Sequence, residues 1–532
     1  MQIPSAIRGG VITAVFGLVV FHCFFTGLAR VGLLGPDEPR YASIAREMSR
    51  TGDWVTPRLN GSPWFEKPPL YYWSAAIGFR LFATPENAAR VPSGILALCA
   101  VVAVVLMARR FYGWGVAIAA AFMLPATVAM TGFARAAATD MPFAACLALT
   151  MVAAAFLLLD EHPAHAGMIA GAFGAALGLA VLAKGPAAIL LSGGSAALWA
   201  IASGNLRRSF RLFHPVAVLV FAAVALPWYS LCAARNPDFL RIFLLEHNVE
   251  RFLTNRYQHQ QPSWFFVPVI LLAVFPWTLL LIPAIGDGWR SLRTGEWRKS
   301  PGVYLTAWVV FPFVFFSASQ SKLPGYILPA VPPLLLLLAG TMAAENGSVP
   351  AARNRRELWI SLGLLIVGLA LSALNSLPKL GHSARGVLET PGLREPLTLV
   401  GMTLLAGALL VAGCLWVRRT ALGVGVAAFA FSFAVGMAAN HVLPLLDKDI
   451  SARQLALAAQ REAGSAPIAV SRVPRAWQYG AEFYLDRALP EWTAETPHPC
   501  WVLAGARHLE NPGSGQGTVT GDYGPAVLVR VQ

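Results

Sequence analysis

The chain has 532 residues, of which 56% are hydrophobic and only 13% are charged, whereas a soluble chain would carry about a quarter charged residues. Its net charge is +14, but the Lys and Arg residues lie in loops between apolar runs and form no basic stripe interleaved with aromatic residues. Composition and charge therefore exclude an ordinary soluble protein and argue against a nucleic-acid partner. They indicate a protein in contact with membrane lipids.

Thirteen apolar runs predict membrane-spanning helices, because most are long enough to cross about 30 Å of hydrocarbon. The predicted spans are 11–29, 91–108, 112–133, 141–159, 166–183, 187–201, 213–232, 264–284, 302–318, 326–343, 358–376, 398–416 and 420–440. The first run is longer than a typical signal-peptide core, so we interpret it as an uncleaved anchor. The apolar stretch 69–82 is shorter and rich in aromatic residues. It predicts an interfacial helix, with a fourteenth span as the alternative.

Short basic clusters predict the orientation of the spans. Clusters such as Arg109-Arg110 and Arg418-Arg419 recur in every second loop, although the loop at Asp160 has no basic residue. Because cytoplasmic loops carry an excess of Lys and Arg, we expect a cytoplasmic N-terminus in a bacterial inner membrane. An odd number of spans then places the C-terminus in the periplasm.

The first outer loop, 30–90, is long and rich in charged residues. Asp37 and Glu38 closely follow the first span and are flanked by Pro36 and Pro39, which stiffen the backbone. Charged groups near the membrane are costly and usually functional, so both acids are candidate catalytic residues. Alternatively, the pair caps a helix over 39–50, but one carboxylate would suffice for that role.

Further ionisable residues occur in the other outer loops. They are Asp140, Lys184, Glu246, His247, Glu250, Arg251 and Lys322. Taken singly, Asp140 is more typical of a helix cap, and each of the others is typical of an ordinary loop charge. Together, acids and bases from five outer loops fall on one face of the membrane, which predicts a reaction site at that surface.

The residue types in these loops suit a phosphate-linked donor. Two or more of the cations Arg40, Lys67, Arg251 and Lys322 would hold a phosphate as it leaves with its developing charge. Asp37 would orient or deprotonate an acceptor, or stabilise an oxocarbenium-like centre. Glu66 and His247 would share a hydrogen bond or, alternatively, a divalent metal such as zinc. No essential cofactor is expected.

From position 444 onward the sequence loses its long apolar runs. An amphipathic helix is predicted over 451–462 and strands over 468–473, 501–504 and 526–531. We therefore predict an all-α polytopic membrane domain over 1–443 and a small α/β periplasmic domain over 444–532. The small domain contains no recognisable catalytic motif, so packing or acceptor docking is its expected role.

Several motifs together resemble the bacterial aminoarabinose transferases, which are GT-C membrane glycosyltransferases. The resemblance covers most of 30–330 and rests on Asp37-Glu38-Pro39-Arg40-Tyr41-Ala42, Gly52-Asp53-Trp54, Phe65-Glu66-Lys67-Pro68, Lys184-Gly185, Glu246-His247, Arg251-Phe252, Trp264-Phe265-Phe266-Val267-Pro268 and Lys322-Leu323-Pro324 with Tyr326. It implies a GT-C fold and transfer of 4-amino-4-deoxy-L-arabinose from undecaprenyl phosphate to a phosphate of lipid A. That transfer would give resistance to polymyxin and other cationic peptides.

The resemblance also implies roles for individual residues. Asp37 and Asp140 match the paired acids of GT-C enzymes. Arg40, Lys67 and Arg251 match groups that face the donor phosphate, with Tyr326 as the aromatic side chain near it. Glu66 and His247 match positions that could hold a metal ion.

Two other functions remain open. The run Pro68-Pro69-Leu70-Tyr71-Tyr72 is also common in the protein mannosyltransferase-like branch, whose members would transfer a hexose or mannose from undecaprenyl phosphate to protein or another glycan. A transporter of lipid-linked sugars belongs to a different class. Transporters bind substrate near the bilayer midplane, whereas the ionisable residues of this chain lie on one face, which favours an enzyme.

Overall fold

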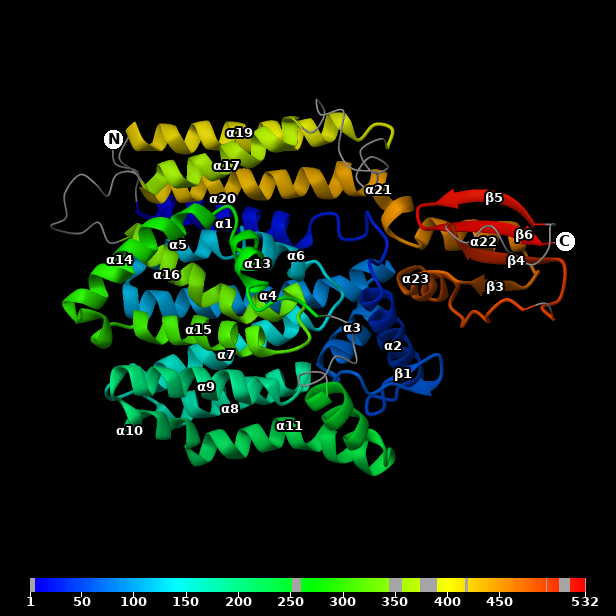
Figure 1. The fold of residues 1–532 in the computed structure, drawn as a ribbon. Coiled ribbons are helices and arrows are strands. Elements are labelled where there is room, and N and C mark those ends of the chain that lie inside the picture. Colours follow the sequence, from blue (N-terminus) through cyan, green and yellow to red (C-terminus); the bar gives the residue numbers. More distant parts are fainter. Residues whose placement is uncertain are drawn as a thin grey trace.

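The computed structural model describes residues 5–250, 260–343, 356–373, 390–416, 420–493, 495–506 and 517–531. Long helices run side by side through most of the molecule, and a small sheet with two helices lies at one end of them (Figure 1). The loops and short helices of the first 90 residues lie at that same end. Sequence-distant charged segments therefore meet there.

The helical region begins with α1 (Ser5–Val20) and ends with α21 (Leu443–Ile450). The helices between them are α2 (Asp37–Thr51), α3 (Leu70–Leu81), α4 (Pro85–Tyr112), α5 (Trp114–Met123), α6 (Val128–Ala134), α7 (Asp140–Leu158), α8 (Ala166–Lys184), α9 (Ala187–Ser203), α10 (Leu206–Ser209), α11 (Pro215–Arg235), α13 (Phe266–Ala273), α14 (Leu281–Thr294), α15 (Gly302–Ala318), α16 (Val331–Ala343), α17 (Arg356–Ala373), α19 (Arg394–Trp416) and α20 (Thr420–Met437). Shorter helical turns are η1 (Phe21–Phe25), η2 (Phe210–Phe213), η3 (Arg241–Glu250), η4 (Thr278–Leu280), η5 (Glu296–Lys299), η6 (Pro324–Ala330) and η9 (Ala438–Val442).

The chain is a multi-pass membrane protein. Within its described residues, seven helices are long and apolar enough to cross a membrane, and nine spans result if each of two bent helix pairs counts as one. The bent pairs are α5 with α6 and α13 with η4 and α14. The helix α3 has 12 residues, so it extends about 18 Å and is too short to cross about 30 Å of hydrocarbon.

The first outer loop forms a compact unit of its own. The helix α2 is amphipathic and ends at Gly52, which adopts a left-handed conformation. A two-residue hairpin of β1 (Arg58–Leu59) and β2 (Ser62–Pro63) follows it. Tyr41, Tyr71 and Tyr72 are buried between α2 and α3. This packing holds both helices in a fixed position at the outer end.

The C-terminal segment contains a four-stranded mixed sheet in the order β3-β4-β6-β5. Its strands are β3 (Ile468–Ser471), β4 (Cys500–Gly505), β5 (Gly517–Tyr523) and β6 (Ala526–Val531), and its helices are α22 (Arg453–Ala463) and α23 (Arg475–Leu485). Among these four strands, β3 pairs with β4 in parallel, and β4 with β6 and β5 with β6 pair antiparallel. The sequence predicted α22, β3, β4 and β6, but not β5 or α23.

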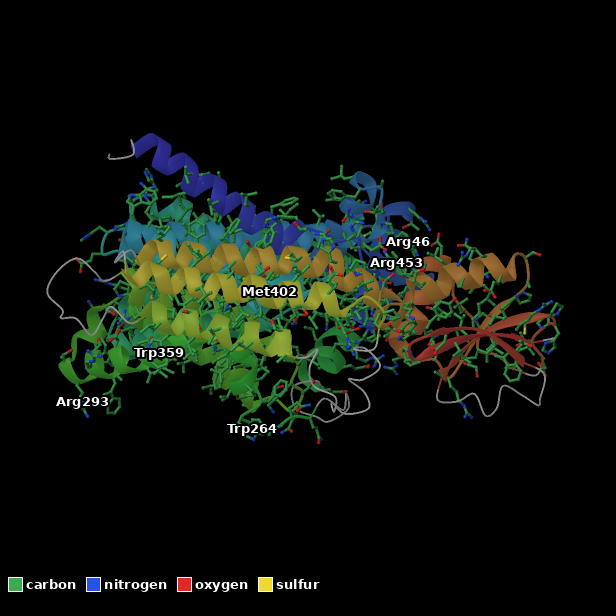
Figure 2. The ribbon with its side chains drawn as sticks, turned by 90° about the horizontal axis from the view of Figure 1, so that it is seen from above. Arg46, Trp264, Arg293, Trp359, Met402 and Arg453 are labelled. Atoms are coloured by element: carbon green, nitrogen blue, oxygen red, sulfur yellow. The ribbon has the colours of Figure 1, made fainter. Side chains whose placement is uncertain are left out.

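A polar junction attaches this segment to the start of the chain. Asp447 accepts a hydrogen bond from the backbone N–H of Gly32 (2.7 Å) and pairs with Arg453 (2.8 Å). Arg453 also pairs with Glu86 (3.3 Å), which accepts a hydrogen bond from Tyr484 (2.9 Å). Figure 2 shows Arg453 and Arg46 close to the boundary between the N-terminal helices and the C-terminal segment.

Candidate active site

The first turn of α2 presents Asp37 and Arg40 together. Pro36 precedes the helix, and Asp37 lies in its first turn, where the helix dipole favours negative charge. Arg40 Nη2 lies 2.6 Å from Asp37 Oδ1 and 3.0 Å from Glu66 Oε2. The Asp37 side chain is 50% exposed, whereas those of Arg40 and Glu66 are almost buried. Asp37 is therefore the group of this trio most accessible from outside.

Glu66 and Lys67 come from the segment that leads into α3. Lys67 Nζ lies 3.2 Å from Glu66 Oε1, so Glu66 contacts a cation through each carboxylate oxygen. Both side chains are nearly buried. Arg40 and Lys67 thus lie around one carboxylate, and their contact with the donor phosphate stays a prediction.

A second pair joins the cluster from α7 and α8. Asp140 is the first residue of α7, and Lys184 Nζ lies 2.6 Å from its Oδ1. Lys184 Nζ also lies 4.8 Å from the centre of the Tyr326 ring. Gly325 lies against this pair, since a Cβ there would come within 2.8 Å of Asp140 Oδ1. The absence of a side chain at Gly325 lets the helical turn η6, which carries Tyr326, lie close to Asp140.

Asp140 of the second pair acts electrostatically on Asp37. Partial burial raises the pKa of Asp37; the positive charges of Arg40 and Lys67 oppose this rise, and the acids Glu66 and Asp140 add to it. Burial alone would lower the pKa of Arg40, but Glu66, Tyr41 and Asp37 raise it above its usual value. We refer to Asp37, Arg40, Glu66, Lys67, Asp140 and Lys184 as the outer charge cluster.

Glu38 lies in a different environment from its neighbour Asp37. It is 7% exposed, and its Oε2 pairs with Arg90 (2.6 Å) and accepts the N–H of Leu34 (2.7 Å). Its Oε1 accepts the N–H of Ala137 (2.8 Å). Both oxygens are thus engaged by groups of the protein, which favours a structural role. The catalytic role suggested from sequence stays a prediction.

Lys322 is also engaged by the protein itself. It is 7% exposed, and its ammonium group donates hydrogen bonds to the carbonyl oxygens of Ser319 (2.5 Å) and Gln261 (3.0 Å). These contacts join two loops and leave less of the ammonium group for a ligand. The contact of Lys322 with the donor phosphate stays a prediction, and these two hydrogen bonds do not favour it.

The predicted metal pair, Glu66 and His247, has less structural support than the outer contacts described above. Glu66 already contacts two cations, and no group of three or more His, Cys, Asp or Glu side chains suitable for a metal occurs in the described ranges. His247 lies in η3. The Glu66–His247 metal pair stays a prediction, and we derive no step through a metal. Arg251 lies outside the described residues.

Sequence reasoning did not identify the aromatic side chains around Arg40. The rings of Tyr41, Trp64 and Tyr479 lie 5.1, 5.4 and 5.6 Å from Arg40 Cζ. Tyr479 belongs to α23, more than 400 positions away in the sequence. No local sequence pattern predicts a contact between residues so far apart. Tyr41 and Trp64, by contrast, are sequence neighbours of Arg40 and Glu66, and this closeness is a signal that could have identified them.

The cluster combines carboxylates and cations in the way that transfer from a phosphate ester requires. Cations stabilise the negative charge that develops on a leaving phosphate, and a carboxylate orients a nucleophile or stabilises a cationic sugar carbon. Asp37 is partly exposed beside Arg40 and Lys67, so both functions are available within one site.

Comparison with protein families gives one matching family model. Residues 66–230 match the family described as dolichyl-phosphate-mannose-protein mannosyltransferase. This region includes Glu66, Lys67, Asp140 and Lys184 and therefore contains most of the outer charge cluster.

Curated relatives match over a longer region. The chain is 33% identical over 404 residues to an undecaprenyl phosphate-alpha-4-amino-4-deoxy-L-arabinose arabinosyl transferase of Pseudomonas aeruginosa, covering 74% of this chain and 70% of that protein. It is 36% identical to a protein of that name from Pseudomonas fluorescens, covering 66% and 63% of the two chains. The chain is also 33% identical to the protein of that name from Edwardsiella ictaluri, covering 62% of this chain and 59% of that protein. The chain thus spans less than two thirds of the latter two relatives.

A solved structure has the same fold. The ArnT protein from Cupriavidus metallidurans bound to undecaprenyl phosphate superimposes with a TM-score of 0.82, covering 99% of this chain and 98% of the other. The two sequences are 24% identical.

Proposed function

Because the chain belongs to the family of undecaprenyl phosphate-aminoarabinose arabinosyl transferases, we propose that it transfers 4-amino-4-deoxy-L-arabinose from undecaprenyl phosphate to a phosphate of lipid A. The observation that carries this proposal is the outer charge cluster, in which three carboxylates and three cations come from the first outer loop and from the ends of the spans α7 and α8. The transfer would neutralise lipid A and so give resistance to polymyxin.

The donor phosphate is assigned to Lys67 and Arg40. In the reaction, an oxygen of the acceptor phosphate forms a bond to the anomeric carbon of the sugar, and the bond from that carbon to the undecaprenyl phosphate oxygen breaks. The leaving phosphate takes the electron pair, and the adjacent cations stabilise the added charge. Their nearly buried position strengthens this effect because less water screens it.

Asp37 is assigned to the acceptor and the sugar. An acceptor phosphate is already ionised at neutral pH, so Asp37 need not remove a proton. Its half-exposed carboxylate would bind the amino group of the sugar or stabilise positive charge at the anomeric carbon. If the acceptor were a hydroxyl, Asp37 would serve as its general base. Asp140 and Lys184 lie 2.6 Å apart, with the Tyr326 ring beside Lys184.

We also propose thirteen spans, with the outer charge cluster and a separate domain over 444–532 in the periplasm. In support, each predicted span has a counterpart among the described apolar helices, once the two bent pairs and four shorter helices are included. The basic loops support a cytoplasmic N-terminus.

The test is mass spectrometry of lipid A from a strain that lacks its own aminoarabinose transferase and expresses this chain. We expect aminoarabinose on lipid A with the native chain and none with Asp37→Asn. The matched control is Asp238→Asn, because Asp238 is an exposed acid that pairs only loosely with Arg241 (3.6 Å). Unmodified lipid A despite good expression and available donor would contradict the proposal, and a fully active Asp37→Asn variant would contradict the role of Asp37.

A second candidate is transfer of mannose or another hexose to protein or glycan. The match of 66–230 to the dolichyl-phosphate-mannose family favours it. The same experiment separates the two, because a hexose transferase would leave lipid A unmodified and would consume undecaprenyl phosphate-linked hexose instead.

A further inference from the structure

The C-terminal helix α23 contributes one side chain to the surroundings of Arg40. The Tyr479 ring lies 5.6 Å from Arg40 Cζ, a distance at which a guanidinium group is attracted to the face of an aromatic ring. Tyr41 and Trp64 supply two further rings, both from the first outer loop. Arg40 is thus surrounded by three rings, one of which comes from the other end of the chain.

These rings matter because the ion pairs of Arg40 do not fix its plane. Both ion pairs of Arg40, to Asp37 and Glu66, use the same nitrogen, Nη2, which also donates a long hydrogen bond to the Tyr41 hydroxyl (3.5 Å). A fork of two parallel hydrogen bonds would set the orientation of the guanidinium plane, whereas two bonds from one nitrogen allow the group to swing about that atom. The buried Nε has no hydrogen-bond partner within the described residues. The cation–aromatic contacts with the three rings are therefore the remaining contacts that restrain the guanidinium group.

The helix α23, which carries Tyr479, and its C-cap Asp486 also contact α2 away from Arg40. Asp486 pairs with Arg46 (2.9 Å) and Arg50 (2.6 Å) of α2. Phe483, one helical turn after Tyr479, lies with its ring centre 4.2 Å from Arg46 Cζ. The two helices pack side by side, as Figure 1 also shows for α2 and α23. The position of Tyr479 is consequently set by the packing of α23 and not by the flexibility of an isolated loop.

We propose that Tyr479 is a positioning residue of the donor-phosphate site, whose ring restrains Arg40 so that its guanidinium group faces the phosphate of undecaprenyl phosphate. This inference rests on the proposed function, since it takes Arg40 and Lys67 as the phosphate contacts. It assigns part of the site to the C-terminal segment, which contains none of the charged residues of the outer charge cluster.

The experiment measures binding of undecaprenyl phosphate to the full-length purified chain in detergent. Loss of the ring in Tyr479→Leu is expected to weaken binding by about three- to tenfold, the effect of a partly buried cation–aromatic contact. Tyr479→Phe keeps the ring and should bind like the native chain. Thermal unfolding of each variant reports whether the protein is folded.

Asp486→Asn is the matched control because it weakens the same helix contact at the end away from Arg40. It should lower the unfolding temperature without changing the Kd. A purely structural role of Tyr479 would reduce the number of binding-competent molecules while leaving their Kd unchanged. If Tyr479→Leu gives too little folded protein, Tyr479→His provides a weaker ring and an intermediate Kd is expected.

The outcomes separate the inference from the proposed function. A native Kd in Tyr479→Leu or Tyr479→His, an equal weakening in Asp486→Asn, or an equal weakening in Tyr479→Phe would each overturn the role of the ring. If Arg40→Gln and Lys67→Gln both bind undecaprenyl phosphate like the native chain, the proposed donor site itself is wrong. Loss of binding in those two variants with a native Kd in Tyr479→Leu would refute the inference alone.

Discussion

Asp37 and Glu38 are adjacent acids in one helix turn, yet their side chains differ in burial and in hydrogen bonding. Both oxygens of Glu38 are engaged by Arg90 and by backbone N–H groups in a buried site, whereas the side chain of Asp37 is half exposed in the outer charge cluster. A carboxylate whose hydrogen-bonding capacity is already used stabilises the fold. One that remains accessible beside cations is available for a ligand. Accessibility therefore separates the two roles where sequence position does not.

The largest effect is expected from breaking the Glu38–Arg90 pair. Arg90→Met leaves the buried carboxylate of Glu38 without its cation, and removal of one partner of a buried ion pair costs about 3–5 kcal/mol of folding free energy. Arg90 also donates to the carbonyl oxygens of Leu28, Val31 and Gly32. We expect a severe loss of folded protein in size-exclusion chromatography and thermal unfolding. A stable but inactive Arg90→Met variant would instead indicate that Glu38 and Arg90 belong to the reaction site. It would contradict the distinction between a structural Glu38 and an accessible Asp37.

Lys67→Gln should have the opposite pattern. Lys67 contacts Glu66 (3.2 Å) and is proposed to stabilise the leaving phosphate, so its loss should reduce the transfer rate by about 100- to 1000-fold. The unfolding temperature should change far less than in Arg90→Met. Transfer is measured on purified enzyme with lipid-linked aminoarabinose and lipid A. Loss of stability together with activity would make Lys67 a structural residue like Glu38.

The smallest expected effect concerns the stability of Asp37 itself. Because burial raises the pKa of Asp37, the folded protein binds this proton more tightly than the unfolded chain does. Ionisation of Asp37 therefore lowers stability as the pH rises through its pKa. Asp37→Asn should unfold at an equal or slightly higher temperature than the native chain at pH 7, and the difference should shrink at pH 4. A clear loss of stability at pH 7 would place Asp37 with Glu38 among the structural acids.

The sequence predicted the parts of the fold that depend on local patterns. The apolar runs, the helix α2 and three of the four C-terminal strands follow from length, periodicity and composition. The helix α23 was missed because its short sequence contains Gly480, a residue type that disfavours the interior of a helix. The sequence also brought Asp37, Arg40, Lys67 and Asp140 into one candidate site, since outer loops must share one side of the membrane.

What the sequence could not supply is the partner of each charge. Lys322 resembles Lys67 as a lysine that precedes a proline-containing turn, but only tertiary structure shows its ammonium group bound to two carbonyl oxygens. Arg90 lies near the start of an apolar helix and gives no local signal of its pairing with Glu38. Likewise, the contact of Lys184 with Asp140 depends on how α7 and α8 pack.

The junction between Gly32, Leu33 and the C-terminal segment has a consequence for biosynthesis. Their backbone N–H groups donate to Asp447 and Tyr484, which follow 415 and 451 positions later in the chain. A ribosome adds about 5–20 residues each second, so about 20 to 90 seconds separate the synthesis of the two ends. During that time the segment around Gly32 and Leu33 is already synthesised but lacks these partners. The protein therefore acquires its finished outer surface only after the last span has been inserted, and a nascent chain in the membrane is not yet an assembled enzyme.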